Sequence, residues 1–387
     1  MSEQILMTGN KIKIITFSHY GQLYGANRSL LTLLISCCDK IEWWVICRRE
    51  GDFTKELAKA GIKFSVIDFK SDVYSPPLSF PLLRGCYKLL YNLGIALYLA
   101  ILVARKGVNL VHTNSSVIFI GSLVAFFSRK KHLWHIREFV YEDYNLRYSL
   151  GKAAFNFFAK RAACNICISK SIQETRYIQS NVKAITRIIY NGLVTEELVP
   201  PKQRNAADVV TISIVGVINP AKNQLMAVKA VNLLLKKNIN VKLKIVGDVG
   251  SPDYHKVLTD YIDHENIGSR VEFVGFVKET SRIFKDTDIS LMCSFSEAFG
   301  RVTVESMMYG VPVVAFGSHG TIEIIDNEVN GLLYFGDEST MAQQIEVLIQ
   351  NPELYARISK NAVEDVRKHF TIKTYVNNFV DEATRHI

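Results

Sequence analysis

Two successive runs of alternating strand-like and helix-like segments constrain the fold of this 387-residue chain more than any other feature. Short runs rich in β-branched residues recur between longer segments with helical periodicity, first over residues 11–190 and again over residues 209–370. Such alternation is typical of α/β domains built on parallel sheets. The sequence therefore predicts an α/β protein with two open-sheet domains of similar size.

A polar stretch with two prolines, residues 200–205, interrupts the alternation and is typical of an interdomain linker. It predicts a first domain over residues 1–198 and a second over residues 206–370. Residues 371–387 are expected to form an amphipathic helix that crosses back onto the first domain. Two such domains that face one another would leave a cleft between them. A ligand is expected there, because open α/β sheets bind ligands beyond the carboxyl ends of their strands.

The expected elements follow directly from this pattern. Strands are predicted at residues 11–17, 42–47, 63–69, 110–113, 133–137, 165–168 and 185–190, and then at 209–215, 241–246, 271–274, 289–293, 311–316 and 331–334. Helices are predicted to begin at residue 29 and to cover residues 224–236, 302–309, 341–349, 352–370 and 372–387.

Charge and apolar patterning favour an anionic membrane surface as a partner. The net charge is +9, and basic residues lie beside apolar and aromatic runs at residues 80–106, 126–137 and 152–161. They form no single polar stripe, which argues against nucleic acid and for a lipid surface. The apolar run 89–104 has 16 residues, fewer than the roughly 20 that a membrane span needs, so a buried or interfacial helix is expected.

Cysteine usage and the N-terminus favour the cytoplasm. The seven cysteines show no regular spacing, which argues against a disulfide framework and for a reducing compartment. Residues 1–10 lack the basic and apolar regions of a signal peptide. We therefore expect a cytoplasmic protein, peripheral on the inner face of the cell membrane.

The segment Cys-Ser-Phe-Ser-Glu-Ala-Phe-Gly, residues 293–300, is the first candidate for chemistry. It follows an expected buried strand and precedes an expected helix, whose first N–H groups favour a diphosphate. Gly300 permits close approach of a ligand to the backbone. Glu297 and Glu305 would repel phosphate but suit sugar or ribose hydroxyls. On spacing alone, a helix-capping glutamate and an ordinary surface glutamate are an equal alternative.

Residues 296–314, with Glu-x7-Glu followed by Ser-Met-Met-Tyr-Gly-Val-Pro-Val-Val, resemble the signature of retaining glycosyltransferases of family 4, which have the GT-B fold of two Rossmann-like domains. Segments 214–224, 244–248, 271–276 and 320–331 resemble that family in order and spacing, as does Asn191-Gly192. The resemblance is dense over residues 209–345 and loose in the first half. It implies a metal-independent transfer from a UDP- or GDP-linked sugar, with no cofactor.

The resemblance also implies roles for individual residues. Glu297 would hold hydroxyls of the transferred sugar, Glu305 the ribose, and Lys222 the departing diphosphate. Other donor contacts would come from the phosphate-loop glycine and from backbone N–H groups at the helix start, namely Gly216, Phe299, Gly300, Arg301 and Val302. One departure is Val217, because the family usually has arginine directly after this glycine. Two alternatives follow: Arg301 substitutes for the missing cation, or turnover is weaker.

Four residues of the first half complete the candidate site. Gly25 and Asn27 belong to Gly-Gln-Leu-Tyr-Gly-Ala-Asn, residues 21–27, which resembles the family's glycine loop near donor phosphate and acceptor. An ordinary strand-to-helix turn is the alternative. His135 matches the family's histidine that touches the donor sugar. Arg137 is a candidate for an acceptor phosphate, and a strand-end ion pair with Glu138 is the alternative.

Two motifs imitate metal sites. Asp286-Thr287-Asp288 resembles the metal-binding Asp-x-Asp of the other large transferase fold, but it lies at an expected helix-to-strand turn. Cys164 and Cys167 have half-zinc-site spacing without a second pair, and a strand would point them to opposite faces. We expect no metal at either motif.

The sequence thus predicts a retaining glycosyltransferase that moves sugar from a nucleotide sugar to a lipid-linked saccharide in bacterial-type cell-surface polysaccharide synthesis. Two alternatives stay open: a nucleotide-sugar epimerase of the same fold, and a non-catalytic nucleotide-sugar-binding subunit.

Overall fold

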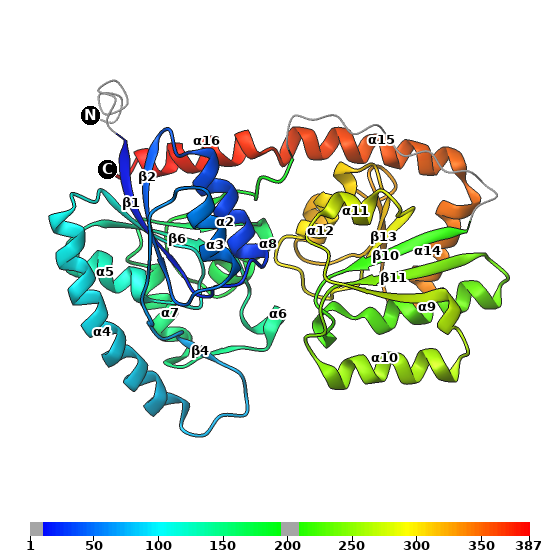
Figure 1. Cartoon of the computed structure of the whole chain (residues 1–387), viewed down its shortest axis with the longest axis horizontal. Coiled ribbons are helices and arrows are strands. Elements are labelled where there is room, and N and C mark those ends of the chain that lie inside the picture. Colours follow the sequence, from blue (N-terminus) through cyan, green and yellow to red (C-terminus); the bar gives the residue numbers. More distant parts are fainter. Residues whose placement is uncertain (1–10, 195–208) are drawn as a thin grey trace. The chain divides into compact units, whose positions relative to one another are not determined.

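The computed structural model describes residues 11–194 and 209–387. These residues form two compact units (Figure 1). Unit 1 comprises Met1–Gly192 with Ile372–Ile387, and unit 2 comprises Leu193–Thr371. The predicted boundaries at residues 198 and 206, the linker 200–205 and the segment 1–10 lie outside the described residues.

Unit 1 contains a seven-stranded sheet in the order β3-β2-β1-β5-β6-β8-β9, and all its strand pairs are parallel. The strands are β1 (Ile12–Ser18), β2 (Ile41–Cys47), β3 (Phe64–Val66), β5 (Leu110–Thr113), β6 (Lys131–Ile136), β8 (Cys164–Cys167) and β9 (Thr186–Ile188). The central strands are apolar along most of their length because helices cover both faces of a parallel sheet. All seven predicted strands are present, with ends shifted by up to three residues.

Two helical layers cover this sheet. α2 (Gly25–Ser36), α3 (Asp52–Lys59) and α16 (Ile372–Thr384) contribute to one apolar core with β1, β2, β5, β6 and β8. α4 (Pro81–Arg105), α5 (Ile120–Ser128) and α7 (Gly151–Ala159) cover the opposite face. The short elements of this unit are β4 (Val73–Tyr74), β7 (Arg147–Tyr148), α6 (Tyr141–Tyr144) and α8 (Lys170–Gln173).

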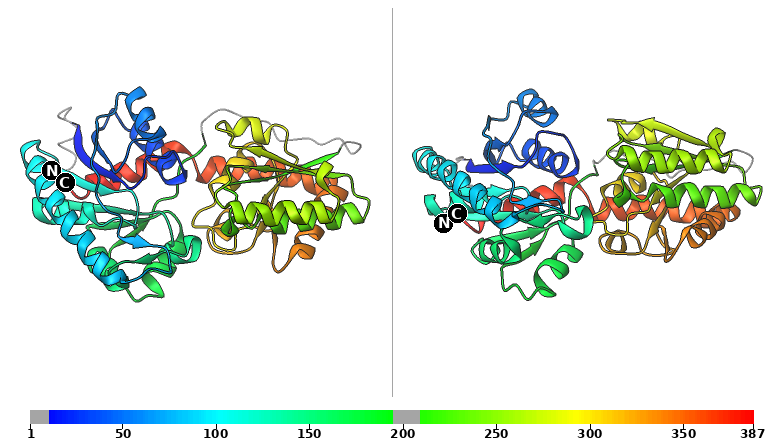
Figure 2. Two further views of the ribbon diagram at one scale, coloured as in Figure 1. Left: turned by 60° about the horizontal axis from the view of Figure 1, so that its bottom comes forward. Right: turned by 90° about the horizontal axis from the view of Figure 1, so that it is seen from below.

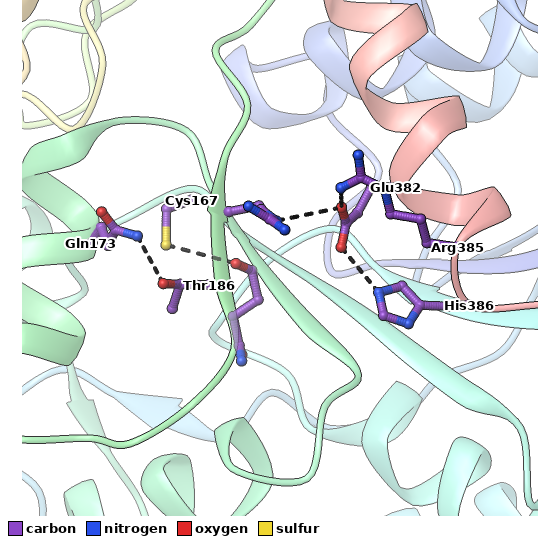
Figure 3. Close-up of polar contacts among 8 residues, drawn as sticks. Cys167, Gln173, Thr186, Glu382, Arg385 and His386 are labelled. Carbon is purple, nitrogen blue, oxygen red and sulfur yellow. Dashed lines mark hydrogen bonds and ion pairs between the residues drawn. The ribbon is translucent and has the colours of Figure 1, made fainter.

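The C-terminal helix α16 is part of unit 1, as the fold prediction requires. Tyr375, Val376, Phe379 and Val380 are buried in its core. Near the end of the helix, Glu382 is also buried and contacts Arg385 at 3.1 Å, His386 at 3.0 Å and Arg187 of β9 at 3.8 Å (Figure 3). This cluster gives a buried carboxylate two arginines and a histidine as partners, and the contact with Arg187 holds the end of α16 to the sheet.

Helix α4 differs from the prediction in length and in burial. It has 25 residues and begins at Pro81, not at residue 89, because Pro81 at the first turn starts the helix eight residues before the apolar run. By length and composition it could cross a membrane. Only 28% of its most apolar 18-residue window is buried, so most of that window is exposed. The apolar run of 16 residues thus underestimates the helix, which is mostly exposed rather than buried, and the interfacial alternative stays a prediction.

Unit 2 contains a six-stranded parallel sheet in the order β12-β11-β10-β13-β14-β15 (Figure 2). The strands are β10 (Val210–Val215), β11 (Val241–Val246), β12 (Val271–Gly275), β13 (Ile289–Met292), β14 (Val313–Phe316) and β15 (Leu332–Tyr334). α9 (Gln224–Lys236), α10 (Pro252–His264) and α14 (Glu338–Gln350) pack on one core, while α11 (Thr280–Phe284) and α12 (Arg301–Met308) pack on the other side. α13 (Thr321–Ile324) and α15 (Pro352–His369) complete the unit.

Candidate functional site

The topological switch point of unit 2 brings the predicted donor residues together. The order of the strands reverses between β10 and β13, which are neighbours in the sheet. Loops that follow the carboxyl ends of two such strands form a ligand-binding crevice in open α/β sheets. Here these loops are residues 216–223 and 293–300, and Asn223 Nδ2 donates a 3.5 Å hydrogen bond to Cys293 O across them.

Lys222 and Glu297 form an ion pair across this crevice. Lys222 Nζ lies 2.7 Å from Glu297 Oε2, and the two side chains are 31% and 17% exposed. The Oδ1 of Asn219 accepts from Lys222 N and caps the short turn that carries the lysine. A cation and a carboxylate thus meet at the strand ends and stay accessible from solvent, which suits a ligand with both phosphates and hydroxyls.

The helix α12 begins at this crevice. Gly300 precedes its first residue with φ +95°, a left-handed conformation that favours glycine. The first N–H groups of a helix lack intrahelical acceptors and favour anions. Phe299 and Val302 contribute backbone here, since the Phe299 ring is buried against Phe370 and Val302 packs on a core cluster.

A set of buried hydroxyls surrounds the start of α12. Their oxygens have no hydrogen-bond partner in the described chain: Ser294, Ser296, Thr303 and Thr321. Buried polar atoms are normally satisfied, so four such atoms around one loop indicate a site where a polar ligand supplies the partner. Sequence reasoning missed these hydroxyls, although two of them lie in the segment 293–300.

Glu305 is placed on the second turn of α12. It is 8% exposed, and its Oε1 lies 3.1 Å from Arg301 Nη2, one turn earlier. Arg301 therefore neutralises Glu305 at the helix start, while Lys222 neutralises Glu297. Each predicted carboxylate in this half of the site has its own cation.

Close backbone contacts hold the phosphate loop in place. A Cβ on Gly247 would lie 2.1 Å from Gly216 O, and a Cβ on Gly250 would lie 2.4 Å from Val217 Cγ1. Only glycine at both positions lets the loop after β11 pack against residues 216–217. Val217, where the family usually has arginine, is packed against this second loop.

A pocket of about 370 Å³ lies at the ends of β11 and β12, next to the loop that begins at Gly247. Its lining mixes apolar and charged side chains, and the carboxylate of Glu279 lies 2.8 Å from Arg282 within it; the other lining residues include Lys244, Val246, Val274, Phe276 and Lys278. An apolar pocket with a few convergent polar groups is the usual form of a small-molecule site. The predicted segment 271–276 supplies two of these residues.

In unit 1 the corresponding switch point lies between β1 and β5. Gly25 is the first residue of α2, and Asn114 Nδ2 donates to Ala26 O at 3.2 Å. Asn27 is fully buried. Its amide donates to Tyr20 O and Gln22 O, and its Oδ1 accepts from Ser18 Oγ at 2.7 Å. Asn27 therefore shapes the loop, with no polar atom left for an acceptor.

His135 lies inside the core of unit 1. It is 0% exposed, stacks parallel to Phe379 of α16 at 6.3 Å, and has His112 Nε2 at 3.3 Å. Burial first, and then the charge of Arg137, holds the pKa of His135 well below its usual range. The imidazole is neutral, and the alternation of β6 points it to the face of the sheet that α16 covers.

Arg137 is buried in a network of neutral acceptors. Its guanidinium donates to Asn114 Oδ1 at 2.7 Å, Asn191 Oδ1 at 2.7 Å and Tyr375 OH at 2.9 Å. The alternative ion pair with Glu138 is absent, because the Glu138 carboxylate accepts from Ser115 and Ser116. Arg137 joins the strand end, α16 and residues near the unit boundary, a role the sequence did not indicate.

Comparisons with known proteins agree with this architecture. Residues 196–365 match the family model described as glycosyl transferases group 1. An uncharacterized glycosyltransferase of Haemophilus influenzae is 23% identical over 265 residues, which cover 66% of this chain and 72% of that protein. The alpha-monoglucosyldiacylglycerol synthase of Streptococcus pneumoniae is 25% identical over 285 residues, or 66% of this chain and 63% of the synthase.

Solved structures share this fold. The crystal structure of Anabaena HepE in complex with UDP and glucose superposes with a TM-score of 0.77 at 22% identity, covering 96% of this chain and 99% of that one. The chain has the GT-B fold, and its second half matches the model of glycosyl transferases group 1.

Neither metal-like motif gathers ligands in the described ranges, where no group of three His, Cys, Asp or Glu side chains could hold an ion. Asp288 accepts from Thr211 N at 2.8 Å, at the start of β10. Cys164 and Cys167 are buried free thiols on β8.

Proposed function

We propose that this chain is a glycosyltransferase that transfers a sugar from a nucleotide sugar to a hydroxyl of a lipid-linked saccharide, with retention of configuration. The observation that supports the proposal most is the convergence of Lys222, Glu297 and the start of α12 at one switch point, where they lie beside the buried hydroxyls of Ser294 and Thr303. Such a site offers positive potential to a diphosphate and hydrogen-bond partners to a sugar ring.

In the proposed reaction each group acts on a different part of the donor. Lys222 and the N–H groups at the start of α12 take up the charge that develops on the leaving diphosphate. Glu297 accepts from hydroxyls of the transferred sugar, and Glu305 accepts from the ribose. The pocket lined by Val274 and Phe276 takes the nucleobase. Because protein groups supply the positive charge, the reaction needs no metal.

Retention follows if the acceptor attacks from the face that the diphosphate leaves. The bond between the anomeric carbon and the diphosphate oxygen breaks, the bond to the acceptor oxygen forms on the same face, and the acceptor proton passes to the departing phosphate. This front-face course rests on the family-4 resemblance.

A lipid-linked saccharide is the proposed acceptor, and the cytoplasmic face of the membrane is the proposed location. The basic and apolar character of unit 1 supports a membrane partner, and the seven free thiols fit a reducing compartment. One relative is named as the synthase of a glucosylated diacylglycerol. Assembly of a bacterial-type surface polysaccharide is the proposed setting.

A thermal-shift screen against UDP-, GDP- and ADP-linked sugars tests the donor proposal, since a ligand that binds only the folded state raises its stability. We expect one nucleotide class to raise the melting temperature of the wild type and to lose this effect in Lys222→Met. No shift with any donor would contradict the proposal.

Incubation with donor alone separates the two alternatives. An epimerase would interconvert the donor sugar without an acceptor, and a binding subunit would shift in the screen but neither hydrolyse nor transfer. Slow hydrolysis with net retention, followed by proton NMR of the released sugar, is the result expected of the proposed transferase.

A further inference from the structure

Helix α4 lies at the periphery of unit 1 (Figure 1) and carries an apolar stripe of exposed side chains. Its members are Leu83, Tyr87, Leu90, Leu97 and Ile101, and each is between 49% and 69% exposed. We call these five residues the α4 stripe. Their spacing of four, three, seven and four residues places them on one helical face. At 1.5 Å per residue the stripe is about 27 Å long.

The buried face of α4 is the opposite one, and it consists mainly of small residues. Gly85, Ala96 and Ala100 pack toward the unit together with Leu99 and Val103. A surface helix of a soluble domain normally shows the reverse arrangement, with polar residues outward. An outward stripe of this size marks an interaction site.

The charges around the stripe identify its partner. From residue 73 to residue 137 the chain has eight lysines and arginines and no aspartate or glutamate. Arg84 is exposed near one end of the stripe, and Arg105, Lys106, Arg129 and Lys131 are exposed at the ends of α4 and α5, two helices in direct contact. Phe126 adds a further apolar side chain that is 68% exposed. Apolar side chains flanked by cations match an anionic lipid surface.

Polar bonds on the buried side show that α4 lies along the unit. The side-chain amide of Asn92 forms two hydrogen bonds with the backbone of Lys70. Its Oδ1 accepts from Lys70 N at 2.8 Å, and its Nδ2 donates to Lys70 O at 2.9 Å. Lys88 Nζ donates to Val73 O and Ser149 Oγ. A membrane-spanning helix would have to break these bonds, whereas a helix that lies in the interface keeps them.

We infer that the α4 stripe inserts into the interfacial region of an anionic bilayer and holds unit 1 at the membrane surface. This inference rests on the proposed function for its lipid-linked acceptor, and it assigns the contact to one helix face. The flanking cations give the preference for anionic lipid, and the stripe gives the depth of insertion.

Vesicle flotation of the full chain at low salt tests the inference, with phosphatidylglycerol–phosphatidylcholine vesicles and phosphatidylcholine vesicles as probes. The stripe variant is Leu83→Asn with Leu90→Asn. Its matched control is Val257→Asn with Val347→Asn, two exposed valines on α10 and α14 of unit 2. We expect the stripe variant to lower partition into anionic vesicles at least tenfold and the control to leave it unchanged. Lys130→Gln with Lys131→Gln should lower the preference for anionic over neutral vesicles.

Equal partition of the wild type and the stripe variant would overturn the inference. So would a vesicle-free wild type that is dimeric by sedimentation and becomes monomeric in the stripe variant, because the stripe would then bind a second copy. Donor-induced thermal shift on the same samples keeps the two proposals apart. A stripe variant that binds donor normally but not vesicles supports both, and normal vesicle binding without any donor shift rejects only the proposed function.

Discussion

At the scale of single residues, the pair Lys222–Glu297 decides how the proposed donor is bound. The two charged atoms are 2.7 Å apart, so a diphosphate that binds Lys222 must compete with Glu297. A sugar hydroxyl does not compete with Glu297 for Lys222. It donates to Glu297 instead and leaves Lys222 free to bind phosphate. The pair therefore couples recognition of the sugar to recognition of the diphosphate.

This coupling predicts different effects for UDP alone and for the whole donor. Lys222→Met should weaken UDP at least tenfold, since a charge-assisted hydrogen bond contributes about 1.5–3 kcal/mol. Glu297→Gln should bind UDP as well as the wild type or better, because the competing charge is gone, yet bind the complete donor more weakly. Calorimetric titration with both ligands measures this, and parallel losses for both ligands in Glu297→Gln would refute the coupling.

Gly300 gives a second prediction at this scale. Gly300→Ala places a Cβ at φ +95°, 3.1 Å from Ile324 Cδ1, and should cost about 1–2 kcal/mol of stability. Donor affinity should fall as well, because the start of α12 must shift. Gly268→Ala is the control, since its Cβ meets nothing nearer than 3.9 Å. Chemical unfolding of both variants provides the measurement, and equal stabilities would contradict the strain.

At the scale of elements, α16 is expected to stabilise unit 1 far more than its terminal position suggests. Phe379 is fully buried and packs against Trp43, His112 and His135. Phe379→Ala should cost about 3–5 kcal/mol, as large-to-small core changes do. Asn378→Ala, on the exposed side of the same helix, should cost less than about 0.5 kcal/mol. Urea unfolding followed by tryptophan fluorescence compares them, and similar losses would show that α16 is loosely attached.

Most elements were predictable from the sequence because each pattern is local. β5, α9 and β11 begin and end where periodicity and β-branched runs placed them. The start of helix α4 was not predictable in this way. Its first eight residues extend the helix before the apolar run 89–104, and they include a proline, a glycine and a cysteine between the apolar residues. Local composition cannot report which face of that helix is covered.

The site could be predicted where it depends on one strand–loop–helix segment. Glu297, Gly300 and Glu305 follow one another along the chain, and Lys222 follows the neighbouring strand. The interior positions of His135 and Arg137 depend on α16, which is more than 230 residues away in sequence. The partner of Glu138 likewise depends on a loop after a different strand. Long-range packing of this kind leaves no local signal.

At the scale of the whole molecule, the two units differ in their titratable groups. Burial lowers the pKa of four histidines of unit 1, to about 3 for two of them: His19, His112, His132 and His135. Unfolding returns the pKa of each histidine to its usual value of 6.5. At a pH between the folded and the unfolded pKa, each histidine therefore binds a proton when unit 1 unfolds. Their contribution to stability is present above pH 6.5 and is lost as the pH falls.

Two buried carboxyls act in the opposite sense. Burial raises the pKa of Asp72 to about 7, so this carboxyl releases a proton on unfolding between pH 5 and 6.5, and burial also raises the pKa of Glu138. The four histidines outnumber these two carboxyls, so unit 1 takes up protons on unfolding and loses stability as the pH falls.

Unit 1 should therefore unfold steeply on acidification from pH 6.5 to pH 5. All three tryptophans belong to this unit, namely Trp43, Trp44 and Trp134, so their fluorescence reports it alone. His132→Gln should shift the fluorescence midpoint to lower pH, whereas replacement of the exposed His264 should not. A tryptophan signal that is independent of pH over this range would contradict the assigned proton uptake.

The most direct test of the central claim is sugar transfer into lipid. The purified chain is incubated with the donor class found by thermal shift, labelled in its sugar, and with a bacterial membrane lipid extract. We predict label in the lipid fraction for the wild type, with retained anomeric configuration, and at least tenfold less for Glu297→Gln and for Lys222→Ala. Lipid label that is equal in all three proteins, or a wild type that leaves the lipid unlabelled while it epimerises the donor, would contradict the account.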